Sequence, residues 1–256
     1  MLSQLKTFST TDDSTAVFPL PESGHFSAHR DDIFCEEEFP LSVMWHTDHP
    51  DMGLHTHDFM ELVLVLDGSA RHMTEEGEYL IHPGDVFVIP PGVAHGYKGC
   101  DGMELVNINY ETNRLNLPNT GLKGFPGYRA LFTLEPAFRS RHEFKGRLHL
   151  PPHKSREVSQ LVKDLQEELY RRKDGFHFIC LTLLMQVIGQ LSRTYTEMET
   201  STSRSFLRLA QVLQHIESHY EDDLKLEDLT KAAAMSTRTL QRCFQESFAM
   251  PPTHYL

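Results

Sequence analysis

The sequence has few cysteines, no excess of positive charge and no long uninterrupted apolar run. Only four cysteines occur in 256 residues, and they form no CxxC pair. A disulfide framework or a cysteine zinc site is therefore not expected, and a reducing cytoplasm is the natural compartment. The formal net charge of −12 argues against a protein that coats nucleic acid along its whole surface.

The longest apolar stretch, residues 176–189, is interrupted by His177, Thr182 and Gln186. We interpret it as too short to span a bilayer. The N-terminus carries no apolar run that resembles a signal sequence. A soluble protein with no membrane partner is expected, and its 39% apolar residues suffice to fill a core.

The texture of the sequence changes along the chain. Residues 1–24 are polar and aperiodic, as in a loose tail. From 25 to 150, short apolar runs such as ELVLVL and DVFVIP are separated by turn signals, which predicts an antiparallel barrel or sandwich with an irregular exit over 111–150. Helical periodicity covers 151–196, a linker is expected over 197–204, and 205–256 is helical again. The predicted fold class is α+β.

The helical pair at 151–196 has two interpretations. Residues 158–169 carry one apolar stripe, whereas the segment from 176 to about 195 is apolar on most of its surface. Such a helix must be buried, either against its own domain or against a second subunit. We favour the subunit contact, because the preceding barrel has a core of its own, and we therefore expect a homodimer.

Residues 55–61, HTHDFME, contain three potential metal ligands, His55, His57 and Glu61. Residues of equal parity share one face of a strand, so His55, His57 and Glu61 should point the same way if the segment is one regular strand. A second segment, 84–95, turns at Pro90 and delivers His95. These side chains predict a convergent polar pocket.

The two segments resemble the two motifs of the cupin family. The first motif, HxHx3Ex6G, is matched by His55, His57, Glu61 and Gly68, and the second, Gx5PxGx2H, by Gly84, Pro90, Gly92 and His95. His49 and Gly99 depart from the family pattern, where glycine and asparagine are usual. In metal-binding cupins the two histidines, the glutamate and the later histidine hold a divalent first-row metal, so the resemblance implies such a site here. The alternative is that the same side chains hydrogen-bond a polar ligand without metal, so that no cofactor is required.

The inward polar groups of the predicted barrel suit a polyhydroxylated ligand. The candidate ligand-binding residues are His55, His57, Glu61, Tyr79, His95 and Asn107. A small polar effector, in particular a monosaccharide, is the expected partner.

Residues 226–248 are typical of two short helices joined by a tight turn. Ser236 is placed to cap the second helix, whose buried stripe is Leu240, Cys243 and Phe244. The remaining side chains face solvent, as a helix presented to the DNA major groove requires. The candidate DNA-binding residues are Ser236, Thr237, Arg238, Thr239, Gln241 and Arg242. An ordinary helical hairpin with solvated arginines is the alternative.

This region resembles the first helix-turn-helix of AraC-type transcription regulators. The matching residues are Met235, Ser236, Arg238, Leu240, Arg242, Phe244, Pro252, Tyr255 and Leu256. Thr230, Ala234 and Ala249 depart from the pattern, the two alanines standing where glycine relieves a left-handed turn. In that family a second helix-turn-helix follows, whereas this sequence stops at Leu256. We therefore expect either a fragment or a chain that binds DNA through one half only.

Cupin pocket, helical pair, linker and helix-turn-helix follow one another as in sugar-responsive AraC-type activators, and HTHDFMELVLVLDG is similar to the L-rhamnose regulators of that group. The resemblance implies a non-enzymatic, homodimeric regulator that binds promoter or operator DNA and a small effector. Two alternatives remain at this point. One is a metal-dependent cupin enzyme, such as a dioxygenase or sugar isomerase; the other is a truncated regulator that senses and dimerises without binding DNA.

Overall fold

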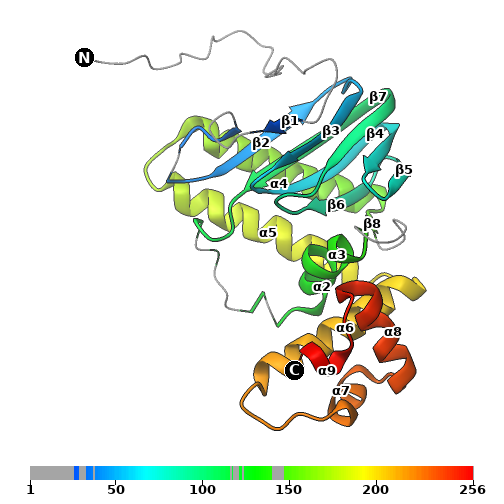
Figure 1. Cartoon of the computed structure of the whole chain (residues 1–256). Coiled ribbons are helices and arrows are strands. Elements are labelled where there is room, and N and C mark those ends of the chain that lie inside the picture. Colours follow the sequence, from blue (N-terminus) through cyan, green and yellow to red (C-terminus); the bar gives the residue numbers. More distant parts are fainter. Residues whose placement is uncertain are drawn as a thin grey trace.

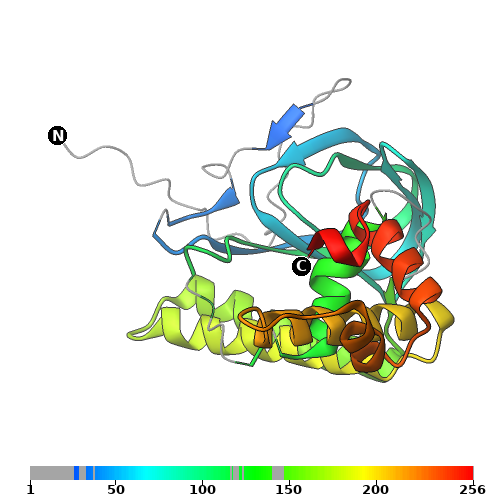
Figure 2. The same ribbon diagram turned by 60° about the horizontal axis from the view of Figure 1, so that its bottom comes forward.

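The structure is a computed structural model that describes residues 26–28, 33–36, 38–115, 117, 121–122, 124–139 and 147–255. The predicted tail, 1–24, lies outside the described residues. A curled sheet occupies one side of the molecule, two long helices cover it, and a group of shorter helices lies at one end (Figures 1 and 2). This arrangement confirms the α+β class.

Within the described residues, eight strands form the sheet, in the order β1-β3-β7-β4-β6-β8, with β2 added to β7 and β5 to β4. All described pairings are antiparallel except that of β1 with β3. The strands are β1 Phe26–Ala28, β2 Leu41–His46, β3 Met52–His57, β4 Met60–Thr74, β5 Gly77–Ile81, β6 Asp85–Ile89, β7 His95–Tyr110 and β8 Leu148–His149. Figure 2 shows the sheet end-on, where its strands curl into a barrel.

Both faces of this sheet are buried, and they belong to two separate apolar clusters. On β4, Leu62 and Leu64 belong to the outer cluster, whereas Val63 and Val65 belong to the barrel interior. All four side chains are at most 1% exposed. The alternation follows from the pleat, which sends successive side chains to opposite faces. Helices cover the outer face and the curled sheet encloses the inner one, so the strand reads as a continuous apolar run.

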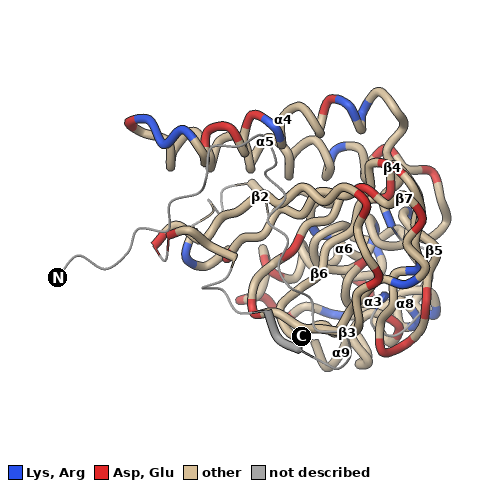
Figure 3. The backbone as a smooth tube through the Cα atoms, turned by 90° about the horizontal axis from the view of Figure 1, so that it is seen from above, with Lys and Arg blue, Asp and Glu red and all other residues tan. Residues whose placement is uncertain are grey.

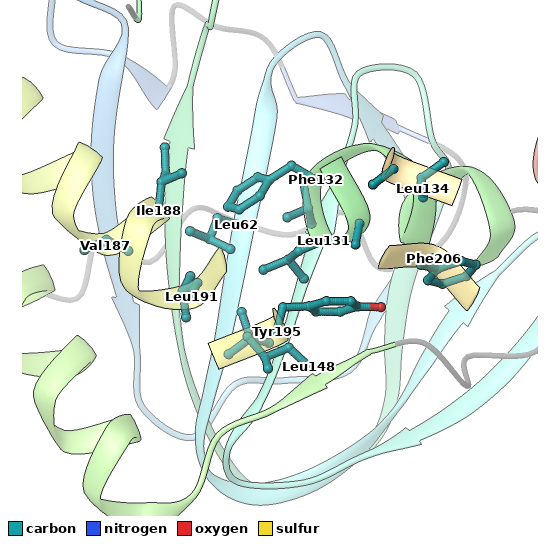
Figure 4. Packing of buried hydrophobic residues seen from close by; sticks show 14 of the residues in the cluster. Leu62, Leu131, Phe132, Leu134, Leu148, Val187, Ile188, Leu191, Tyr195 and Phe206 are labelled. Carbon is teal, nitrogen blue, oxygen red and sulfur yellow. The ribbon is translucent and has the colours of Figure 1, made fainter. Parts of the chain in front are cut away.

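A helical segment lies where the sequence predicted an irregular exit from the barrel. It consists of α2 (Pro126–Arg129), a π-helical turn η1 (Ala130–Leu134) and α3 (Glu135–Arg139). Figure 4 shows Leu131 and Phe132 of η1 beside Leu62 of the sheet, in the apolar cluster that also contains Leu191 of the long helix α5. The prediction for this part of 111–150 was therefore wrong: glycine and proline suggested loops, but the apolar residues after Phe125 pack as helix.

The covering helices are α4 (Pro152–Arg171) and α5 (Phe176–Thr196), which pack side by side. The C-terminal half of α5 is buried through Leu184, Val187, Ile188 and Leu191, whereas Phe178 near its start is 73% exposed. At 21 residues, α5 is long and apolar enough for a membrane span, so the prediction that it is too short was wrong. Its packing in the outer cluster gives it a role in the core instead.

The remaining helices are α6 (Ser201–Ser218), α7 (Leu226–Ala233), α8 (Thr237–Phe248) and α9 (Pro252–Tyr255). Helix α6 begins at Ser201, inside the expected 197–204 linker, because the Thr200 hydroxyl caps it by accepting from the Ser203 N–H at 3.0 Å. Its apolar side joins the outer cluster, which therefore runs from the sheet to α8 without interruption.

Candidate functional site

The bend between β3 and β4 places the candidate ligands of the barrel. His55 and His57 lie on β3, and Glu61 lies on β4 beyond a bend at Asp58 and Phe59. The segment is therefore not one regular strand, so the parity argument does not apply to it directly. The side chains nevertheless converge, because Nε2 of His57 is 2.8 Å from a carboxylate oxygen of Glu61. Nε2 of His95, at the start of β7, is 3.3 Å from the same oxygen.

The main chain orients three of the imidazoles in the same way. Nδ1 of His57 lies 2.8 Å from the carbonyl oxygen of Phe59, and Nδ1 of His95 lies 3.1 Å from that of Val93. Nδ1 of His55 is 3.1 Å from the carbonyl oxygen of Gly53. In each case the carbonyl is two residues away along the chain. An Nδ1–H donated to such a carbonyl fixes the tautomer in which Nε2 can bind a metal, an arrangement common around metal-binding histidines.

The pair formed by His57 and Glu61 is buried and polar. Both ring nitrogens of His57 lie within hydrogen-bond distance of an oxygen, Nδ1 of the Phe59 carbonyl and Nε2 of the Glu61 carboxylate. Burial by itself raises the pKa of Glu61, but the hydrogen bonds from His57 and His95 outweigh it and hold that pKa well below its usual value. The carboxylate is therefore ionised inside the barrel.

Donor atoms of His57, Glu61 and His95 all lie within 4.8 Å of one another, which would allow them to hold a metal ion. Among the described residues this is the one such group. His55, the fourth expected ligand, is outside it, although its ring centroid lies 4.1 Å from that of His95. Burial, and next the neighbouring His95, lower the pKa of His55 to about 4, so its imidazole is neutral at pH 7. Nitrogen and carboxylate donors of this kind suit first-row divalent metals.

Tyr79 and Asn107 occupy different parts of the barrel. Asn107 is paired with Val63, whose side chain belongs to the barrel interior, so both face inward. Tyr79 lies on β5, half-buried against the same interior cluster, and is paired with His72. The structure thus places both residues along the barrel interior, away from the bend that joins His57 and Glu61.

Sequence reasoning missed four polar residues of the barrel: His46, His49, His72 and Asn109. Asn109 lies directly opposite Glu61 and is 3% exposed. His46 and His49 form an edge-to-face pair with centroids 5.2 Å apart, and His49 contacts Tyr97 in the same way at 5.0 Å. Asn109 could have been found by extending the odd-numbered series on β7.

His72 could not be found by counting parity. Register shifts between Val65 and Arg71 exchange the faces of β4, so that even-numbered Ala70 and His72 point inward beyond them. Gly68 sits in this irregular stretch with φ +69°, and a Cβ there would lie 2.2 Å from the carbonyl oxygen of Gly102. The glycine of the first motif therefore permits a close approach of two strands.

The predicted DNA-binding residues lie at the start of α8. The Ser236 hydroxyl accepts from the Thr239 N–H at 3.3 Å, which confirms it as the N-cap. Leu240, Cys243 and Phe244 form the buried side, as predicted. The residues turned to solvent are Thr237, Arg238, Gln241 and Arg242, whereas Thr239 is half-buried.

The two alanines that replace glycine do adopt left-handed backbone. Ala234 ends α7 with φ 48° and ψ 45°, and Ala249 ends α8 with φ 56° and ψ 24°. Both turns therefore keep the geometry that glycine favours, with a Cβ that disfavours it.

Known proteins with similar sequences include transcriptional activators. A family model described as an AraC-like ligand binding domain matches residues 43–115, which hold the bend and His95. The transcriptional activator RhaR of Escherichia coli K12 is 25% identical over 228 residues, covering 89% of this chain and 77% of the relative. RhaR of Shigella boydii serotype 4 matches with the same identity and coverage. The chain is therefore similar to AraC-type transcriptional activators, and residues 43–115 match their ligand-binding domain.

Solved structures similar to this chain include the AraC-like transcriptional activator CuxR. It shows a TM-score of 0.35 at 11% identity, over 73% of this chain and 61% of that one. A cupin-like protein from Thermotoga maritima shows a TM-score of 0.27 at 21% identity, over 30% of this chain and 61% of that one. Along this chain, strands β1 to β7 precede the described helices α2 to α9.

Proposed function

We propose that this AraC-type chain is a cytoplasmic, sequence-specific DNA-binding regulator whose barrel senses a small polar ligand and which is not an enzyme. The observation that carries the proposal is the division of α8 into two sides. Leu240, Cys243 and Phe244 fix the helix in the outer cluster, and Arg238 and Arg242 are left exposed. In this helix-turn-helix, short polar groups and two arginines at the exposed side suit the major groove.

Electrophoretic retardation of the DNA upstream of the chain's own gene tests the proposal. We expect Arg238→Ala and Arg242→Ala each to weaken retardation on the order of tenfold, because one base contact contributes about 1–3 kcal/mol. Arg193→Ala removes an exposed arginine from α5, outside the helix-turn-helix, and serves as the matched control. Equal binding by all three variants and the wild type would show that α8 does not read DNA.

The proposed ligand is a monosaccharide. The barrel interior carries buried imidazoles, the Glu61 carboxylate and the Asn107 and Asn109 amides, which together offer donors and acceptors to several hydroxyl groups. A thermal-shift panel that contains L-rhamnose and other pentoses and hexoses tests this assignment. Binding stabilises the native state in proportion to the logarithm of the sugar concentration, so a true ligand raises Tm progressively. Asn109→Ala should reduce that shift.

A divalent metal is a further component of the proposal. His57, Glu61 and His95 would hold it, and its charge would polarise ligand oxygens. Loading with Mn²⁺ or Zn²⁺ followed by elemental analysis tests this, and His95→Gln should lower occupancy whereas His82→Gln, at the turn after β5, should not.

The alternative function, a metal-dependent cupin enzyme, is supported by the same group of His57, Glu61 and His95. A metal-dependent cupin enzyme would use the same three side chains, and stoichiometric iron or manganese together with no DNA retardation would favour it. The regulator proposal is preferred because it also accounts for α8.

Helices α4 and α5 support the proposed homodimer. Tyr170 is 75% exposed and Phe178 is 73% exposed, on neighbouring ends of the two helices. Such side chains mark association surfaces when they lie together. Phe178→Asp should shift the chain from dimer to monomer in sedimentation analysis, whereas Tyr220→Asp, a change at an equally exposed tyrosine after α6, should leave the dimer intact.

A further inference from the structure

Helix α3 is a short element that contacts both the barrel and helix α8. It contacts β6 on one side and α8 on the other, and it continues directly from η1, which packs on α6. Figure 1 shows α3 between the lower edge of the sheet and α8. Its two final residues, Phe138 and Arg139, make the contacts that matter here.

Arg139 extends from α3 to the barrel. Its side chain is 4% exposed, and its Nη2 donates to the carbonyl oxygen of Val88 on β6. The guanidinium carbon also lies 5.4 Å from the ring centroid of Phe87, which belongs to the interior cluster. Val88 is the β6 partner of Leu62, and the next pair in the ladder joins Ile89 to Glu61.

The positive charge of Arg139 affects His72 inside the barrel. The ring centroids of Phe87 and His72 are 4.8 Å apart, and those of His72 and His95 are 6.1 Å apart. Burial, and next the positive charge of Arg139, hold the pKa of His72 well below its usual value. A series of ring contacts therefore connects the guanidinium to His95 of the candidate metal group.

Phe138 faces the other way. Its ring packs edge-to-face on Phe206 of α6, with centroids 5.2 Å apart. Phe206 is 4% exposed and belongs to the outer cluster, which also contains Leu240 and Phe244 of α8. A displacement of α3 would therefore change the support of the helix that carries Arg238 and Arg242.

We propose that α3 couples the barrel to α8, with Arg139 as the positioning residue that responds to the state of the barrel interior and Phe138 as the contact that passes the response to α6. The purpose of this coupling rests on the proposed regulatory function, but the coupling itself is a property of the fold. A ligand that displaces Phe87 or His72 would change the contacts that hold the Arg139 side chain. Because Arg139 and Phe138 are adjacent in one helical turn, neither contact can shift without moving the other.

Hydrogen exchange of the full chain tests the proposal without a ligand or DNA. We expect Arg139→Gln to accelerate exchange in β6 and also in α6 and α8, by at least about fivefold relative to α4, since site-to-site coupling is typically 5- to 150-fold. Helix α4 packs on α5 and β2 and serves as the internal reference for global destabilisation. Arg139→Lys, which keeps the charge, should restore much of the protection.

Arg147→Gln is the matched control. Arg147 also contacts β6, through its Nε 3.1 Å from a carboxylate oxygen of Asp85, but it lies outside α3. This change should accelerate exchange in β6 while α6 and α8 keep wild-type rates. Equal acceleration of α8 by both substitutions, or none by Arg139→Gln, would overturn the proposal.

Coupling must also run in the opposite direction, because linkage is reciprocal. Phe138→Leu should accelerate exchange in α6 and, through α3, in β6. This variant keeps the proposal open to refutation if Arg139→Gln fails to fold, since an unchanged β6 would contradict it. Loss of DNA retardation or of sugar binding would refute the regulatory function and leave these exchange results standing, so the two failures are distinguishable.

Discussion

Inside the barrel the polar side chains are buried and form hydrogen bonds or ion pairs with one another. On α8 the polar side chains are exposed, and the helix is positioned by the packing of its apolar side. Glu61 is 5% exposed and has His57 and His95 as partners. Arg242 is 65% exposed, and its nearest carboxylate, on Glu246, is 3.9 Å away.

This difference separates two ways of building a site. In the barrel, the candidate binding groups also stabilise the fold, so a substitution should change both properties together. On α8, the exposed residues can change while the fold keeps its stability. The following predictions test that contrast, beginning with the largest expected effect on the free energy of unfolding.

Glu61→Gln should lower the free energy of unfolding by about 3 kcal/mol at pH 7. The amide keeps the shape but removes a buried carboxylate that accepts from His57 and His95, and a hydrogen bond to a charged group contributes about 1.5–3 kcal/mol. Urea denaturation measures the change. Glu76→Gln, in the exposed turn after β4, should stay within about 0.5 kcal/mol. Equal stability of the two variants would show that the Glu61 carboxylate does not stabilise the barrel.

Lowering the pH from 7 to 5 should destabilise the barrel by about 2 kcal/mol for each of His46 and His55. Burial lowers the pKa of both imidazoles from 6.5 to about 4. Below pH 6.5 the unfolded chain therefore binds protons that the folded chain does not, and stability falls until the pH reaches about 4. Glu61, with its lowered pKa, adds a loss at still lower pH.

Urea midpoints across this pH range measure the slope. His55→Gln should remove its share of it, whereas His219→Gln, at the exposed end of α6, should keep the wild-type slope. A pH-independent midpoint between 7 and 5 would contradict the burial of neutral imidazoles.

Ala234→Gly and Ala249→Gly should each stabilise the chain by about 0.5–1 kcal/mol. Both alanines adopt left-handed backbone, where a Cβ is unfavourable. Ala232→Gly, inside α7, is the matched control and should destabilise by about 1 kcal/mol. Thermal unfolding separates the two signs, and loss of stability in all three variants would show that the turns are not left-handed in solution.

Arg238→Ala and Arg242→Ala should change the free energy of unfolding by less than about 0.5 kcal/mol, because exposed ion pairs contribute little. Leu240→Ala, on the opposite side of the same helix and 0% exposed, should cost about 3 kcal/mol. Large losses from both arginine changes would mean that α8 has the same dependence on its polar groups as the barrel.

Much of the fold was predictable because local signals agreed with packing. The apolar runs predicted strands, Ser236 predicted the start of α8, and the spacing of Leu240, Cys243 and Phe244 predicted its buried side. The helical segment after Phe125 was not predictable from composition, since its residues become helical by filling the space between sheet and α5. Its π-helical turn places Leu131 and Phe132 in that space.

The barrel site was predictable only as far as strand parity held. Counting by two found Asn107 and, extended along β7, would have found Asn109. The same rule failed at His72, because register shifts reverse the faces of β4 after Val65. The structure also separates His55 from the three convergent donors, which spacing along the chain could not reveal.

The charge distribution adds to the contrast between the two regions. Figure 3 shows Lys and Arg interspersed with Asp and Glu along α4 and around the strands. From Lys231 to Leu256, by comparison, Lys231, Arg238 and Arg242 stand against Glu246 alone. Residues 231–256 therefore carry a formal charge of +2, and the rest of the chain carries −14.

The carbonyls that orient His55, His57 and His95 each belong to the strand or turn that carries the ring itself. One nitrogen of each imidazole is thus held by the short peptide that carries the ring, and only the other nitrogen is available to groups across the barrel. Substitution of Glu61 or Asn109 would therefore change the polar lining of the barrel while these three Nδ1 contacts remain. Evolution can vary the lining of such a barrel one residue at a time without rebuilding the strands that carry its histidines.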